Sequence, residues 1–150
     1  MGKKELVNDC RGDQSRVLNR ETFFHLLDLE VKRARRYQNF FSLLSMRLKR
    51  LTGRLEGGAP QDGYQKLCRF LSDELRANDI LGALDGDKIV ALLPYADTMA
   101  ADSVKSRFEG NLRYFGFYNE GFELEMSRFC FPVDGTDTGD LIQKLTEAQS

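Results

Sequence analysis

The 150-residue chain has little of what marks several classes of protein. It holds only three cysteines, Cys10, Cys68 and Cys130, which are far apart, odd in number and without a C-x-x-C pair. This spacing supports neither a disulfide framework nor a zinc site, and it favours a reduced, cytoplasmic setting. The single histidine, His25, is interpreted as a surface or packing residue, and no Ser-His-Asp or Cys-His arrangement can be assembled.

Long apolar runs and a strong net charge are also absent. No run approaches the roughly 20 apolar residues of a membrane span, and no signal peptide is visible, so direct membrane insertion is not expected. The formal net charge of −1 favours neither a nucleic acid nor a membrane surface as a partner. The basic run KRARRY at 32–37 has no aromatic platform beside it and is interpreted as a solvated helix face.

The composition is that of an ordinary globular protein, with 41% apolar and 30% charged residues. Residues 1–15 are polar and irregular and are expected to form a lead-in or linker, which leaves 16–150 as one domain. Asn19 is a good N-cap, and the apolar residues after it follow helical spacing. The aromatic residues near the third expected helix are interpreted as core and rim; they are Phe108, Tyr114, Phe115, Phe117 and Tyr118.

The rest of the chain alternates between helical and strand patterns. An Asp-Gly pair lies between two apolar runs and favours a tight hairpin turn. The expected elements after the first helix are a strand at 40–48, a Gly-rich loop at 52–63, a helix from about 64 to 77, a hairpin at 80–93, a helix at 98–115, a strand at 122–131 and a closing helix at 140–148. This order predicts an α+β fold, with a central, mostly antiparallel sheet flanked by helices.

Four segments carry a family resemblance. They are VLNRETF (17–23), FSLLSMRL (41–48), LRANDILGALDGDKIVALLP (75–94) and MSRFCFPVDG (126–135). In this order and spacing they resemble the GGDEF domain, the diguanylate cyclase module of bacterial signalling, over about residues 16–148. The resemblance implies a central sheet flanked by helices, similar to nucleotide cyclase and polymerase palm domains.

The catalytic residues that the resemblance would imply are largely replaced. The family's signature falls on Asp85, Gly86, Asp87, Lys88 and Ile89, so that Lys88 stands where the family has a metal-binding acidic residue. The family's D-x-D metal ligands fall on Arg47 and Lys49. Its N-D-x-x-G-H segment falls in the loop at 52–63, which contains neither Asn nor His.

Joining two GTP molecules needs Mg²⁺ held by carboxylates, and cations at these positions repel the metal. The resemblance therefore implies a degenerate site with no catalytic residue, no metal and no cofactor. Binding of a phosphate without metal by Arg47, Lys49 and Lys88 is an alternative use of the same positions.

One motif of the family is intact. Arg76 and Asp79 form the R-x-x-D pattern that binds the product, cyclic di-GMP, in relatives. An Arg can donate two hydrogen bonds to guanine O6 and N7, and an Asp can accept from guanine N1 and N2. The resemblance implies that Arg107, in the helix after the hairpin, also contacts the ligand. It implies the same for Arg33, because in relatives a further arginine comes to this site from the first helix of a neighbouring domain. The alternative is structural: a cation at a helix end and an Asp that caps a turn.

Three functions follow from these observations. The first is a catalytically inactive signalling domain that is a cyclic di-GMP receptor and contacts a protein partner or a second copy of itself. The second is a protein–protein interaction module that has lost nucleotide binding. The third, an active cyclase, is disfavoured by the three charge reversals.

Overall fold

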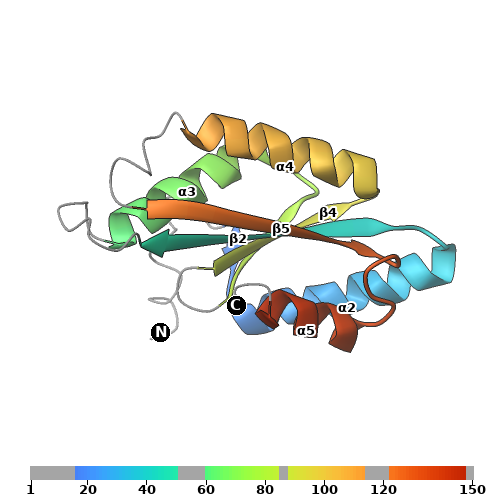
Figure 1. Ribbon diagram of the computed structural model, residues 1–150. Coiled ribbons are helices and arrows are strands. Elements are labelled where there is room, and N and C mark those ends of the chain that lie inside the picture. Colours follow the sequence, from blue (N-terminus) through green and yellow to red (C-terminus); the bar gives the residue numbers. More distant parts are fainter. Residues whose placement is uncertain (1–15, 51–59, 85–87, 114–121, 148–150) are drawn as a thin grey trace.

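The computed structural model describes residues 16–50, 60–84, 88–113 and 122–147 (Figure 1). Five strands form one sheet in the order β1-β3-β4-β2-β5. They are β1 (Val17–Leu18), β2 (Phe41–Arg50), β3 (Ile80–Ala83), β4 (Lys88–Pro94) and β5 (Phe122–Phe131). Only β1 and β3 are parallel, and the other neighbouring strands are antiparallel. The expected α+β fold with a mostly antiparallel sheet is confirmed.

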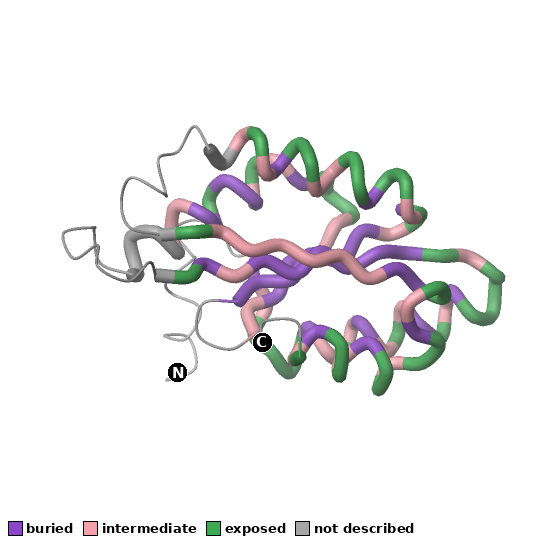
Figure 2. Tube along the Cα trace, in the orientation of Figure 1, coloured by how far each residue is buried: buried purple, intermediate pink, exposed green. Residues whose placement is uncertain are grey.

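Within the described residues, four helices cover the two faces of the sheet. They are α2 (Arg20–Tyr37), α3 (Pro60–Glu74), α4 (Thr98–Arg113) and α5 (Thr138–Glu147). Helices α2 and α5 lie on one face, and α3 and α4 lie on the other (Figure 1). Among the described residues, β2 and β4 form the most buried part of the sheet, whereas β5 is mostly of intermediate burial (Figure 2).

Strand β2 divides the core in two. Because successive side chains of a strand point to opposite faces, Leu44 and Met46 pack into the cluster under α3 and α4. Phe41 and Leu43 pack into the cluster under α2 and α5. All residues at 41–46 are buried, so this part of the strand is buried on both faces, as its apolar sequence predicts.

The start of α2 follows its sequence closely. The side chain of Asn19 accepts a hydrogen bond from the amide of Thr22 at 2.8 Å, which satisfies one of the free amides of the first turn. The helix ends at Gln38, which adopts a left-handed conformation with a φ of 56°. The expected N-cap and the apolar face of this helix are confirmed.

Other boundaries differ from expectation. Helix α3 begins at Pro60, within the segment expected to be a loop, because proline is well tolerated at the first position of a helix. It ends at Glu74 instead of Ala77. The described part of α4 reaches Arg113, and the last two residues of the expected helix, 114–115, lie outside the described residues. Helix α5 begins at Thr138, because Asp137 accepts a hydrogen bond from the amide of Asp140 at 2.8 Å and so caps the helix earlier.

The cysteines also correct an expectation. Cys130 is a buried free thiol, but Cys68 is disulfide-bonded. Sequence spacing cannot show such a bond, because pairing depends on which residues the fold brings together. Separately, none of the described helices is both long enough and apolar enough to span a bilayer.

Gly82 in β3 sets how closely α2 approaches the sheet. A Cβ at this position would lie 2.4 to 2.6 Å from three atoms of Phe23, which is fully buried. We expect Gly82→Ala to lower the free energy of unfolding by about 1–3 kcal/mol, because Phe23 must leave its packed position. Urea unfolding measures this change.

The matched control is Gly110→Ala in the exposed part of α4, where a Cβ meets no atom within 4 Å. Alanine there should raise stability by about 0.5–1 kcal/mol, because glycine is a poor helix former. Equal effects of the two substitutions would contradict the packing of α2 on β3.

Candidate functional site

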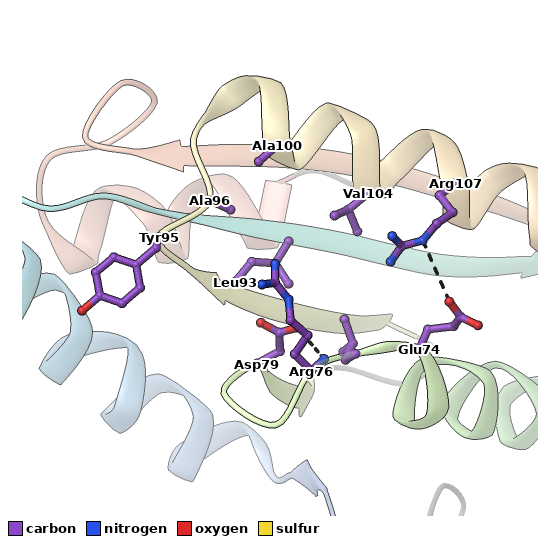
Figure 3. Close-up of a pocket in the computed structure, with 10 residues that line it drawn as sticks. Glu74, Arg76, Asp79, Leu93, Tyr95, Ala96, Ala100, Val104 and Arg107 are labelled. Carbon is purple, nitrogen blue, oxygen red and sulfur yellow. Dashed lines mark hydrogen bonds and ion pairs between the residues drawn. The ribbon is translucent and has the colours of Figure 1, made fainter.

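A pocket of about 500 Å³ opens between α3 and α4, on the face of the sheet away from α2 and α5 (Figure 3). Its charged lining comes from the end of α3, the turn after it and α4: Glu74, Arg76, Asp79 and Arg107. Its apolar lining comes mainly from β4 and from the start of α4: Leu93, Ala96, Ala100 and Val104. The pocket thus combines an apolar surface with several charged groups at its edge.

The chain turns tightly between α3 and β3. The carbonyl of Arg76 accepts from the amide of Asp79 at 3.1 Å, and the Asp79 carboxylate accepts from the amide of Arg76 at 2.8 Å. The turn-capping interpretation of Asp79 therefore matches the observed geometry. This contact uses Oδ2 of Asp79, and no described residue donates to the other carboxylate oxygen.

Two guanidinium groups reach the pocket from opposite sides. Arg76 is exposed and lines the pocket (Figure 3), and its guanidinium makes no hydrogen bond or ion pair with any described residue. Arg107 extends from α4 and places its Nε 3.9 Å from a carboxylate oxygen of Glu74. The structure therefore brings together Arg76, Asp79 and Arg107.

Arg33 does not line this pocket. Its Nη2 contacts Glu30 at 2.5 Å, and its Nη1 donates to the hydroxyl of Tyr95 at 3.1 Å. The guanidinium also lies 5.0 Å from the centre of the Tyr95 ring, which points away from the pocket (Figure 3). The hydrogen bond with Glu30 raises the pKa of Arg33 and holds the side chain on α2.

Two pocket residues were missed by the sequence analysis. Glu74 lies two residues before Arg76, but only the packing of α3 beside α4 places its carboxylate near Arg107. Tyr95 follows β4 with a φ of 62°, a conformation that its sequence does not signal. Neither residue belongs to a recognisable motif, so the sequence alone offered no indication of them.

The cations that the sequence resemblance aligns with metal-binding positions lie on the opposite face of the sheet. Arg47 and Lys49 alternate with Leu48, which packs under α3 and α4, so they point toward the side of α2 and α5. Both form ion pairs with Glu125, at 3.8 and 3.3 Å. Lys88 lies directly opposite Arg47 in the sheet.

Lys88 is 5% exposed, and its ammonium group donates to the carbonyl of Leu145 in the last turn of α5. A cation at this position interacts favourably with the negative end of the helix dipole. Three of the other positions aligned with the signature, Asp85, Gly86 and Asp87, lie outside the described residues, whereas Ile89 is buried in β4. Among the described residues, no group of three or more His, Cys, Asp or Glu side chains could hold a metal ion.

Comparison of the whole fold with solved structures defines its class. A diguanylate cyclase protein from Thermotoga maritima superposes with a TM-score of 0.75 at 18% identity, covering 88% of this chain and 95% of that one. The GGDEF domain of YfiN (TpbB) from Pseudomonas aeruginosa gives a TM-score of 0.69 at 19% identity, covering 88% and 81%. The GGDEF domain of DgcB from Caulobacter crescentus, in complex with c-di-GMP, gives 0.67 at 11% identity, covering 88% and 80%.

The chain is thus an α+β domain with the nucleotide-cyclase palm architecture. More specifically, it has the fold of the GGDEF domain, as its sequence motifs predicted. No family model matches the sequence, and no curated protein matches it. At these identities the likeness concerns the fold, and the chemistry of the site has to be argued from its own residues.

The role of Lys88 can be tested by unfolding. We expect Lys88→Met to lower the free energy of unfolding by about 1–2 kcal/mol, because the buried carbonyl of Leu145 loses a charged donor. Lys88→Glu, which restores a carboxylate at this position, should cost more than Lys88→Met, since a buried anion would face the negative end of α5.

Lys49→Met is the control for the Lys88 substitutions, because Lys49 is half exposed and its ion pair with Glu125 lies at the surface. Its effect should stay within about 0.5 kcal/mol. A fully stable Lys88→Glu variant would show that Lys88 is not part of the packing against α5.

Proposed function

We propose that residues 16–150 form a degenerate GGDEF domain, preceded by a lead-in or linker at 1–15, that has no cyclase activity and binds cyclic di-GMP. The pocket between α3 and α4 is the proposed binding site, and Arg76, Asp79 and Arg107 are its principal ligand contacts. The observation that carries this proposal is the convergence of these three side chains on one pocket.

The chemistry of the pocket suits a guanine base. The exposed guanidinium of Arg76 has its donors available for guanine O6 and N7. The second carboxylate oxygen of Asp79 is available to accept from guanine N1 or N2. The apolar lining offers contact to the face of the base, and a volume near 500 Å³ lies in the range of pockets that hold small ligands. Arg107 adds positive charge for a phosphodiester.

The absence of cyclase activity is proposed from the opposite face of the sheet. Three cations occupy positions where the family holds its metal ions with carboxylates: Arg47, Lys49 and Lys88. Each has a structural partner, either Glu125 or the carbonyl of Leu145. Removing ligands and adding like charge both oppose the binding of a divalent cation.

A protein–protein interaction module is the second candidate. Several large hydrophobic residues are exposed near the end of the domain where β2 begins and β4 and β5 end; they are Tyr37, Phe40, Tyr95, Met99 and Val133. Exposed apolar groups that gather in one region are typical of interaction surfaces. This surface is compatible with ligand binding in the pocket, so a protein partner or a second copy could accompany cyclic di-GMP.

The first functional prediction concerns GTP. Incubated with GTP and Mg²⁺ or Mn²⁺, the protein should produce no cyclic di-GMP above a no-enzyme control, because the metal-binding carboxylates are replaced. Calorimetry should likewise show no GTP binding that Mg²⁺ strengthens. Weak binding without a metal effect would instead indicate phosphate binding by the three cations, and clear product would overturn the proposed loss of activity.

The second functional prediction concerns cyclic di-GMP, measured by calorimetry. Arg76→Ala should weaken binding by at least about tenfold, or 1.4 kcal/mol, because a charged hydrogen-bond donor is lost. Asp79→Asn should have a similar effect. It keeps an oxygen that can accept from the Arg76 amide, so a loss of affinity would reflect ligand contact and not the turn. Arg107→Ala should weaken binding less, because Glu74 competes for this guanidinium.

Arg33→Ala should matter only if the ligand bridges two copies, and its effect should then depend on protein concentration. Arg36→Ala on the same helix is the matched control, since Arg36 is exposed and its side chain makes no hydrogen bond or ion pair with a described residue. Cyclic di-AMP should not compete, because adenine lacks the donor at N1 that Asp79 requires. If excess cyclic di-GMP produces no heat and no thermal stabilisation, the interaction module becomes the better account.

A further inference from the structure

Arg16 makes an unusual set of contacts with the turn that carries Arg76 and Asp79. Its Nη1 donates to the carbonyls of Ser72 at 2.8 Å and Leu75 at 3.2 Å. Its Nη2 donates to the carbonyl of Asp79 at 3.2 Å and also to the carbonyl of Arg76. One guanidinium thus joins four carbonyl oxygens between the last turn of α3 and the start of β3.

The parallel pairing of β1 with β3 explains this position. Val17 lies beside Leu81 in the sheet, so the residue before β1 lies beside the residues that lead into β3. Those residues form the turn from Arg76 to Asp79. The sheet therefore delivers Arg16 to this turn although the two are about 60 residues apart in the chain.

Electrostatics and geometry both favour the contact. The last carbonyls of a helix have no partner within the helix and carry partial negative charge, which a cation offsets. A guanidinium presents five donors in a rigid plane, so it can bind several carbonyls at once, whereas an ammonium group is a single point. The contact also accounts for the end of α3 at Glu74, because the carbonyls beyond it turn toward Arg16 and away from helical partners.

We propose that Arg16 is a positioning residue for the pocket. It fixes the turn so that the guanidinium of Arg76 and the free carboxylate oxygen of Asp79 face the pocket before a ligand arrives. This inference rests on the proposed function for its ligand part, but the ordering of the turn is a separate property of the protein. A site held in its binding geometry in advance loses less conformational freedom on binding.

The test uses Arg16→Lys, which keeps the charge and loses the planar array of donors. Hydrogen exchange by NMR follows the amides of Arg76 and Asp79, both of which are bonded within the turn. We expect their exchange to accelerate by about fivefold or more. The amide of Ala100, which donates to the Asp97 carboxylate at the start of α4, should exchange at an unchanged rate.

Calorimetry with cyclic di-GMP provides the second measurement. Arg16→Lys should weaken binding by about fivefold or more, measured on protein shown to be folded by its unfolding curve. Arg69→Lys is the matched control: Arg69 is an exposed arginine of α3 whose side chain makes no hydrogen bond or ion pair with a described residue and does not line the pocket. It should leave both affinity and exchange unchanged.

The outcomes separate the inference from the proposed function. If the wild-type protein binds cyclic di-GMP and Arg16→Lys binds it equally well, the positioning role is overturned. Unchanged exchange at Arg76 and Asp79 overturns it as well, whether or not the ligand binds. If exchange accelerates but the wild-type protein shows no binding, Arg16 orders the turn and the receptor function is what fails.

Discussion

The two-sided burial of β2 is the constraint on which the rest of the structure depends. This strand pairs with β4 on one side and β5 on the other, and its side chains fill both halves of the core. A shift of its register by one residue would move every side chain to the wrong face. The register therefore decides that Arg47 and Lys49 lie on the side of α2 and α5, whereas Leu44 and Met46 lie under α3 and α4.

A consequence is that the sheet separates two sites. Arg47, Lys49 and Lys88 are on one face, and the pocket with Arg76 and Arg107 is on the other. Because a packed, apolar core lies between them, charge changes on one face need not disturb the geometry of the other. On the first face each of these cations contacts another group of the fold, and Lys88 donates to a carbonyl at the end of α5. This separation would allow a domain with this fold to lack catalysis and still hold a ligand pocket, as we propose for this chain.

Local chemistry determined which parts of the fold could be predicted from the sequence. The N-cap at Asn19 and the strand at 122–131 rest on neighbouring residues, so both were predicted correctly. Val17 and Leu18 form too short a strand to show strand periodicity in the sequence. The end of α3 before Ala77 could not be predicted either, because it depends on contacts with Arg16, which lies about 60 residues away in the chain. Arg76, Asp79 and Arg107 were grouped by resemblance to a family, and no spacing rule could have brought α4 beside the end of α3.

The turn from Arg76 to Asp79 shows that structural and ligand-binding roles need not compete. A carboxylate has two oxygens with several lone pairs, and Asp79 uses one oxygen to close the turn on the Arg76 amide. That closure, together with the Arg16 contacts, limits the directions in which the second oxygen can point. Ligand binding and turn order would then be thermodynamically linked, so each stabilises the other by the same free energy. The intramolecular bond that makes Asp79 resemble a simple turn cap is thus the feature that would prepare it to recognise a guanine edge.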